Sequence, residues 1–485
     1  MSGTTSSSFL NPSAVAVDPT TGKVFISERL NHRILRFSSI SATVNGSAAE
    51  AVLGQVDFTS NLVNQGGSVA ANTLNFVDSI WVDSFGHLWV ADRNNHRILK
   101  FKNASLKASG SDADLVIGQP DFTTNSSGTT QNTTKLPNSV CLDPAGRLWV
   151  SDYNNHRVLR FDNVYSKSNG VNADGVLGQL NFVTNSTGTT QNTFNVPHDV
   201  FVNNSGNLFV ADFLNSRVLG FDNAALKANG ANADRVIGQA DFVSNTGLTS
   251  EIRFNSPTSA ILDHTGRLYV SDFNNNRIMI FNDVMNKANG SSADYVIGQP
   301  DFNSGTANNG GISDRSINEV HWMFFDQTNH YLWVADYKNH RVLRYSMMLK
   351  TSPVMSQISG SVIDEDTVSN AISFTATDIN EQALTITYAS SDESIISSTG
   401  ITFSGDQVSS DGSTYTVTST SVDTTVTLTI TPESNQSGTA NITITVTDPD
   451  GMTATQSFAL TVTSVNDTPV ISTISDLNTN EDTAV

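Results

Sequence analysis

Three features are scarce in this 485-residue sequence: cysteine, long apolar runs, and basic residues near the C-terminus. The single cysteine, Cys141, excludes an internal disulfide. It lies in an apolar stretch without an activating cluster, which indicates a packed thiol and not a nucleophile. No run of 18 apolar residues occurs, so we expect no membrane span. The polar start MSGTTSSSF does not have the pattern of a signal peptide.

Charge is also sparse and unevenly distributed. Charged residues make up 15% of the chain, and the formal net charge is −20. All 26 Lys and Arg residues lie in residues 1–350, which leaves that part at −3 and residues 351–485 at −17. Nucleic-acid binding needs clustered cations that displace counterions from phosphate, and neither part offers them. The acidic tail instead suggests bound calcium or a solvated stalk.

A strand–turn–strand segment is repeated along the first part of the chain. In residues 147–161 two apolar strands flank the turn Asp-Tyr-Asn-Asn, and Asp and Asn suit tight turns because their side chains bond nearby backbone N–H groups. The acid that begins the turn recurs every 60 or 64 residues, at Glu28, Asp92, Asp152, Asp212, Asp272 and Asp336. A period this regular predicts stacked supersecondary units.

Each repeat extends to four short strands. An apolar strand that ends in Asp or Asn precedes the hairpin, and a strand with the motif Gly-Gln-x-[Asp/Asn]-Phe follows it. This fourth-strand motif occurs at 51–58, 115–122, 175–182, 235–242 and 295–302. Four antiparallel strands with Gly and Asn at the turns are typical of a propeller blade. Six such blades would close a ring with few exposed sheet edges.

The run D-x-x-N-H-R-[IV]-L-x-F resembles the NHL repeat over about 330 residues. The resemblance implies a six-bladed NHL-type β-propeller in residues 1–346. We expect the repeated Asp to fasten the turn and the repeated Arg to bridge neighbouring strands or blades. Ser216 and Asn276 replace the histidine in two repeats, which argues against a catalytic role for the other histidines at this position.

The sixth repeat has no fourth-strand motif after Tyr345. Residues 2–18 align with residues 127–143, so the sequence starts just after the place of a fourth strand. We expect that a longer natural protein supplied that strand from upstream. The alternative is a degenerate fourth strand in residues 346–350, SMMLK. Incomplete closure would lower stability, because ring proteins rely on their terminal units.

The composition changes after a linker in residues 347–357. Alternating Thr, Val, Ile and Ser with frequent turn signals predict an antiparallel β-sandwich of about seven strands in residues 358–464. This part resembles the cadherin-like tandem repeat of large bacterial surface proteins. The segment NEDTAV at 480–485 repeats the start of this domain, so residues 465–485 are expected to be the truncated start of a second repeat.

The cadherin-like resemblance implies calcium at the junctions, held by acids of the domain start, a D-x-D element and the linker. The matching residues are Asp364, Glu365, Asp366, Asp448, Asp450 and Asp467. Calcium takes six to eight oxygen ligands from flexible loops, so these acids could converge although they are distant in the sequence. The alternative is that they are turn acids on an acidic surface.

One position at the start of the first strands varies among the repeats. It holds Ser13, Asp78, Asn138, His198, Thr258 and His321. First strands line the channel of a propeller, and Asp78, His198 and His321 fall in blades 2, 4 and 6. Two imidazoles and a carboxylate could hold zinc or another divalent ion with open positions. The run Val-Pro-His-Asp at 196–199 resembles the strand start that carries metal-binding histidines in peptidylglycine amidating lyases. The alternative is three polar residues at a wet channel mouth.

The long polar connections 123–136 and 183–195 are typical of recognition surfaces on a rigid scaffold. We therefore expect a non-catalytic recognition or adhesion module of a large secreted or cell-surface bacterial protein. Its propeller loops would bind a protein or glycan, and its cadherin-like repeats would form a stalk. Two alternatives remain: a metal-dependent lyase or hydrolase at the channel mouth, and a structural spacer.

Overall fold

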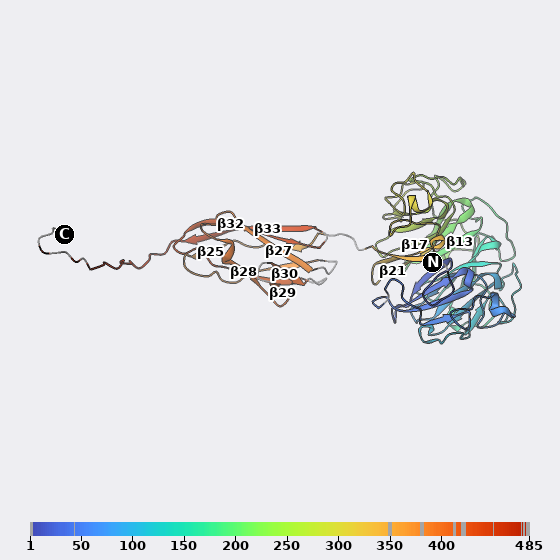
Figure 1. Cartoon of the computed structure of the whole chain (residues 1–485). Coiled ribbons are helices and arrows are strands. Elements are labelled where there is room, and N and C mark those ends of the chain that lie inside the picture. Colours follow the sequence, from blue (N-terminus) through green and yellow to red (C-terminus); the bar gives the residue numbers. More distant parts are fainter. Residues whose placement is uncertain are drawn as a thin grey trace. The chain divides into compact units, whose positions relative to one another are not determined.

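The computed structural model is an all-β chain that divides into two compact units, residues 1–347 and 348–485 (Figure 1). The structure describes residues 3–42, 44–347, 352–378, 383–410, 414–418, 423–449, 451–476, 478 and 481. Within that described part the only helices are short 3₁₀ turns, and no helix could span a membrane.

The first unit contains six antiparallel sheets, each formed by consecutive strands. Blades 1 and 2 comprise β1 (Pro12–Val17), β2 (Lys23–Glu28), β3 (Arg33–Ser39), β4 (Ala51–Leu53), β5 (Val77–Val82), β6 (Leu88–Asp92), β7 (Arg97–Phe101) and β8 (Leu115–Ile117). Blades 3 and 4 comprise β9 (Pro137–Leu142), β10 (Leu148–Asp152), β11 (Arg157–Phe161), β12 (Gly175–Leu177), β13 (Pro197–Val202), β14 (Leu208–Asp212), β15 (Arg217–Phe221) and β16 (Arg235–Ile237). Blades 5 and 6 comprise β17 (Pro257–Leu262), β18 (Leu268–Asp272), β19 (Arg277–Phe281), β20 (Tyr295–Ile297), β21 (Val320–Asp326), β22 (Tyr331–Asp336) and β23 (Arg341–Ser346).

Each repeated turn is a single 3₁₀ turn between the second and third strands. These turns are η1 (Arg29–Asn31), η3 (Arg93–Asn95), η5 (Tyr153–Asn155), η7 (Phe213–Asn215), η9 (Phe273–Asn275) and η11 (Tyr337–Asn339). Other 3₁₀ turns lie in loops, at η2 (Val63–Gly66), η4 (Ala104–Leu106), η6 (Val164–Ser166), η8 (Ala224–Leu226), η10 (Ala307–Gly310) and η12 (Ser398–Gly400). The residue after each repeated turn is left-handed, as in His156 with φ of 52°.

The first strands of neighbouring blades pack against one another around the whole ring, and β21 packs against β1. Apolar residues that alternate along the strands fill the spaces between blades, as Leu148, Val150 and Phe161 do in blade 3. Five sheets have four strands, and the sheet of blade 6 has three among the described residues. The predicted all-β class with a six-bladed propeller is confirmed.

The second unit is a β-sandwich of two sheets around an apolar core that includes Phe374, Leu428 and Ile444. One sheet has the order β24 (Val354–Met355), β26 (Ile372–Thr377), β31 (Thr424–Ile430) and β28 (Ile401–Ser404). The other has the order β25 (Ser361–Asp364), β33 (Thr453–Thr463), β32 (Gly438–Thr447), β27 (Ala383–Ser390), β30 (Tyr415–Thr418) and β29 (Val408–Ser410). β24 lies in the segment expected to be a linker and pairs with β26, so the sandwich begins before residue 358.

Candidate functional site

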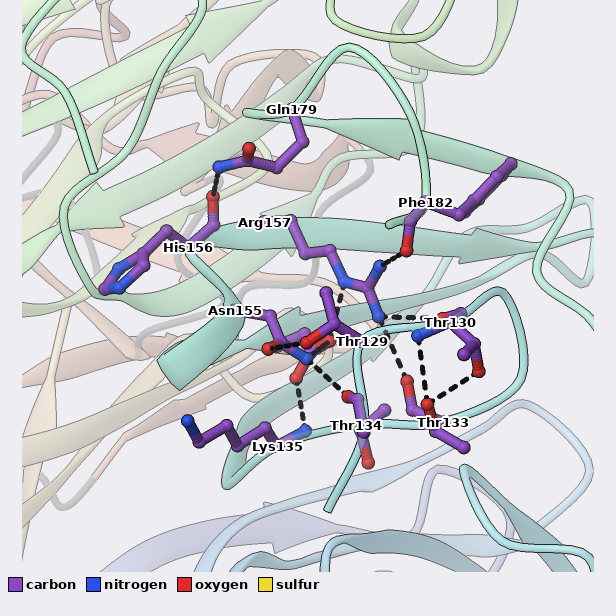
Figure 2. Close-up of polar contacts among 12 residues, drawn as sticks. Thr129, Thr130, Thr133, Thr134, Lys135, Asn155, His156, Arg157, Gln179 and Phe182 are labelled. Atoms are coloured by element: carbon purple, nitrogen blue, oxygen red, sulfur yellow. Dashed lines mark hydrogen bonds and ion pairs between the residues drawn. The ribbon is translucent and has the colours of Figure 1, made fainter. Parts of the chain in front are cut away.

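The repeated Asp and Arg form a buried ion pair that fastens each blade. In blade 3, Asp152 Oδ2 accepts hydrogen bonds from Arg157 Nε at 2.7 Å and from Asn155 Nδ2 at 2.8 Å. Arg157 also donates to the carbonyl oxygens of Thr130 and Phe182, and both charged side chains have no exposed surface (Figure 2). The arginine thus ties the loop before the blade to the segment after its fourth strand. This agrees with the fastening role of the motif, because the Asp152–Arg157 pair joins the neighbouring strands β10 and β11 and the arginine also holds the connection that leads from blade 2.

The histidine of the motif joins neighbouring blades through an acceptor atom. His156 Nδ1 accepts the backbone N–H of Val196 in the next blade at 3.1 Å. Asn276 Oδ1 accepts the corresponding N–H of Glu319 at 2.9 Å. Because this contact needs only an acceptor atom, Asn can replace His and keep the hydrogen bond between the blades. The varying histidines are therefore explained by packing between blades.

The structure brings Asp78, His198 and His321 together at one mouth of the channel, where all three are buried. Asp78 forms ion pairs with Arg29 at 2.7 Å and with Arg93 at 3.0 Å. Arg29 Nη1 donates to His321 Nε2 at 3.1 Å, and the rings of His198 and His321 lie 5.2 Å apart. We call these five residues the plug. It fills this mouth of the channel with two arginines that both pair with the single Asp78 carboxylate, beside the two histidine rings.

The two arginines of the plug belong to a ring of six residues at this mouth, one from the position after each turn acid. These are Arg29, Arg93, Tyr153, Phe213, Phe273 and Tyr337. His198 stacks on Phe213 with centroids 5.4 Å apart, and His321 stacks on Tyr337 at 5.0 Å. Sequence reasoning missed this ring, although two arginines followed by four aromatic residues in a single repeat position were a readable signal. The arginines fall in blades 1 and 2, on either side of Asp78.

Burial sets the protonation of the plug. It lowers the pKa of His198 to about 3 and also lowers the pKa of His321, with the nearby Arg29 charge adding to both shifts. Burial raises the pKa of Asp78, and the two arginines oppose that rise. Both imidazoles are therefore neutral in the folded protein at neutral pH.

The plug as arranged does not fit a zinc ion, because two guanidinium groups occupy the carboxylate that would be a ligand. Among the described residues, no group of three or more His, Cys, Asp or Glu side chains is arranged to hold a metal. The predicted zinc site at Asp78, His198 and His321 thus has no support from this geometry, and it stays a prediction.

A cavity of about 1110 Å³ opens at the other mouth of the channel. Trp81, Phe201 and Phe324, from blades 2, 4 and 6, line it, and the Trp81 ring lies 6.3 Å from each of the other two. Trp322 also lines this cavity, and its ring lies 5.3 Å from that of His198, so it separates the cavity from the plug. We call this cavity the funnel.

Five acids and one amide at the ends of the first strands also line the funnel, at Asp18, Asp83, Asp143, Asn203, Asp263 and Asp326. They bond nearby backbone groups, as Asp83 Oδ1 does with the N–H of Phe85 at 2.9 Å. Deeper in the wall, burial raises the pKa of Asp199 to about 6, although Ser139 Oγ donates to its carboxylate at 2.7 Å. The funnel therefore combines aromatic walls with a polar, acidic rim, which is typical of a binding pocket.

The structure separates the acids expected to bind calcium into two groups. Val465 N donates to Glu365 Oε1 at 2.7 Å, and Thr463 Oγ1 donates to Asp364 Oδ1 at 2.5 Å, at the C-terminal end of β33. Asp448 follows β32 at the opposite end of the β32–β33 hairpin. Ten strand residues separate these ends by about 30 Å. The described acids therefore lie at the two ends of the sandwich, and the calcium prediction stays a prediction.

The remaining acids of the calcium prediction are placed as follows. Asp366 Oδ1 accepts the N–H of Asn435 at 3.0 Å, near the Glu365 end of the domain. Asp467 is exposed, in a segment without strand structure among its described residues. Asp450 lies outside the described residues. One Asp448 oxygen, Oδ2, is buried and has no hydrogen-bond partner in the described part of the chain.

Cys141 lies in β9 and is 1% exposed. Burial raises the pKa of its thiol far above the ordinary value, so the thiolate that a nucleophile needs does not form. The interpretation of this residue as a packed thiol agrees with its surroundings.

The sequence profile of the NHL repeat matches residues 75–101 and 134–161. No curated protein matches the chain. Solved structures with a similar fold include a streptogramin B lyase, 13% identical, which covers 72% of this chain and 86% of its own with a TM-score of 0.39. A gluconolactonase of Xanthomonas campestris is 14% identical, and the match covers 68% of this chain and 84% of the gluconolactonase, with a TM-score of 0.41. The extracellular domain of a putative one-component system of B. thetaiotaomicron is 13% identical, and the match covers 94% of this chain and 57% of that domain, with a TM-score of 0.40. The first unit of this chain is therefore a β-propeller that contains NHL repeats.

Proposed function

We propose that this chain is a non-catalytic recognition module of a secreted or cell-surface protein. The contrast between the two channel mouths carries this proposal. The mouth that holds Asp78, His198 and His321 is closed by mutually paired groups, whereas the opposite mouth opens into the aromatic funnel. The acidic, Thr-rich sandwich and its cadherin-like pattern support a place outside the cell, where it would serve as a stalk.

The funnel suits a glycan ligand. Flat aromatic faces such as those of Trp81 and Phe324 suit the apolar faces of sugar rings, and the acid and amide groups at the rim can accept hydrogen bonds from hydroxyl groups. The connections 123–136 and 183–195 remain a second candidate surface. They lead into the first strands at the plug end, so they lie at the opposite mouth from the funnel.

A glycan panel tests this proposal and separates the two surfaces. We expect saturable binding that weakens at least tenfold in Trp81→Leu, because the substitution removes an aromatic wall. The exposed loop residues Asn125 and Asn185 provide matched controls, and Asn125→Ala and Asn185→Ala should leave the affinity unchanged. The opposite pattern would assign recognition to the loops. Binding to no glycan would contradict the glycan proposal and favour a spacer.

Two further functions follow from the sequence. Calcium at the two ends of the sandwich would stiffen a tandem stalk, and the buried, unpaired Oδ2 of Asp448 supports a ligand role for that residue. A metal-dependent lyase or hydrolase at the plug is the competing alternative, and it would require Arg29 and Arg93 to leave Asp78.

A further inference from the structure

Five blades show how a fourth strand is held. In blade 3, β12 pairs with β11 so that Val176 lies opposite Leu159. Gln179, just after β12, donates to the carbonyl oxygen of His156 at 3.0 Å, and Arg157 donates to that of Phe182 (Figure 2). The corresponding glutamine contacts are made by Gln55, Gln119, Gln239 and Gln299. The same contacts therefore bind the Gly-Gln-x-[Asp/Asn]-Phe motif in all five blades.

The fourth strand also contacts the following blade. Val176 N donates to Asn229 Oδ1 at 3.0 Å, and Gly230 N donates to the carbonyl oxygen of Val176 at 3.0 Å. The contact at Gly230 is close, because a Cβ atom there would lie 3.0 Å from Leu180 Cα. Each fourth strand thus fills a slot between two blades.

The slot between blades 6 and 1 has the same walls without a described strand in it. Arg341 keeps its bonds to Asp336 and to the Ser313 and Ser316 carbonyls, but within the described residues it reaches no phenylalanine carbonyl. Its side chain is 25% exposed, whereas the five equivalent arginines are 0% exposed. β23 is an edge strand of its sheet.

The blade 1 side of this slot is open as well. Asn45 and Gly46 align with Asn229 and Gly230 in the repeat. Asn45 is exposed, and a Cβ atom added to Gly46 would meet no described atom within 4 Å. The equivalent glycines 110, 170, 230 and 290 all have, within that distance, backbone of the segment that directly follows the preceding fourth strand.

We propose that this slot binds an extended segment with the pattern x-V-[IL]-G-Q-x-[DN]-F, supplied from outside residues 1–485. The segment adds to the edge of β23 opposite Val342, Leu343 and Arg344, its glutamine bonds the His340 carbonyl, and its phenylalanine carbonyl accepts from Arg341. The occupant is defined by the other five blades, which make the same interface with this sequence. Strand addition of this kind gains affinity from main-chain bonds and specificity from alternate side chains.

A peptide with the sequence of residues 114–123, DLVIGQPDFT, tests the proposal on the full chain. We expect one peptide to bind per chain by calorimetry, with a higher unfolding temperature for the propeller. The peptide with Gln replaced by Ala should bind at least tenfold more weakly, and a scrambled peptide should not bind. In the protein, Val342→Pro should abolish binding, since proline is tolerated at a strand edge but removes a donor.

Three results would overturn the proposal. The first is no binding of the native peptide, and the second is equal binding of the scrambled one. The third is a dimer of the chain in light scattering that excludes the peptide, which would assign the slot to a second copy. If Val342→Pro fails to fold, the proposal is still tested by comparing the native, Gln-to-Ala and scrambled peptides on the unchanged protein. Glycan binding at the funnel is measured separately, so failure of the two proposals can be distinguished.

Discussion

Replacing Arg157 by alanine should lower the free energy of unfolding of the propeller by about 4 kcal/mol. The substitution leaves the Asp152 carboxylate buried without its partner, and it removes the donors to the carbonyls of Thr130 and Phe182. Breaking a buried pair by removing one partner costs about 3–5 kcal/mol. Urea unfolding followed by tryptophan fluorescence measures this loss.

Arg341→Ala provides the matched control. This arginine makes the same ion pair in blade 6, but its side chain is 25% exposed and it has fewer carbonyl partners among the described residues. Water can solvate Asp336 after the change, so we expect less than half of the loss caused by Arg157→Ala. Equal losses, or a loss below about 1 kcal/mol in Arg157→Ala, would contradict the fastening role of the motif.

Acid should unfold the propeller through His198 and His321. Burial holds the pKa of both histidines below the unfolded value of 6.5, and that of His198 falls to about 3. The unfolded chain therefore binds more protons below pH 6.5, and stability present above that pH is lost as the pH falls towards about 3. For His198 alone the loss is of order 5 kcal/mol at most.

The variant His198→Phe tests this pH dependence. It keeps a ring against Phe213 but leaves the Thr258 carbonyl without its donor, so at pH 7 it should be about 1–2 kcal/mol less stable than the parent. Its stability should nevertheless fall less steeply between pH 6.5 and 4. A fall as steep as that of the parent protein would show that His198 does not set the acid sensitivity.

Asp199 makes stability depend on pH in the direction opposite to that of the two histidines. Burial raises the pKa of Asp199 to about 6, so the folded state keeps a proton that the unfolded chain loses above about pH 4. Its contribution to stability is therefore present below about pH 4 and is lost as the pH rises to 6. Asp199→Asn removes this opposing contribution and should make the acid loss steeper than in the parent.

The blades could be predicted from sequence because their contacts are local. Asp152, Asn155 and Arg157 lie within six residues, and a period of 60 or 64 residues predicts all six copies. The plug could be predicted only in part. Its histidines and Asp78 were singled out, but Arg29 and His321 are 292 residues apart in the chain and meet only when the ring closes. Arg29 contacts both His321 and the Asp78 carboxylate. The spacing of these residues in the sequence does not predict these contacts.

The funnel shows the same limit. Trp81, Phe201 and Phe324 lie on first strands that sequence reasoning placed along the channel, yet whether aromatic side chains fill that channel or leave it open depends on how six blades pack. In the sandwich, alternation predicted the strands but not their register. The β32–β33 register then places Asp448 away from Glu365.

Metal content of the purified chain, measured by elemental mass spectrometry, tests the central claim that the channel mouth at Asp78 is closed by a structural plug. We expect no stoichiometric transition metal in the parent protein or in His198→Phe. Calcium that is retained in His198→Phe would be consistent with ions in the sandwich. One zinc or similar ion per chain that is lost in His198→Phe would show that this mouth is a metal site and would favour a metal-dependent enzyme.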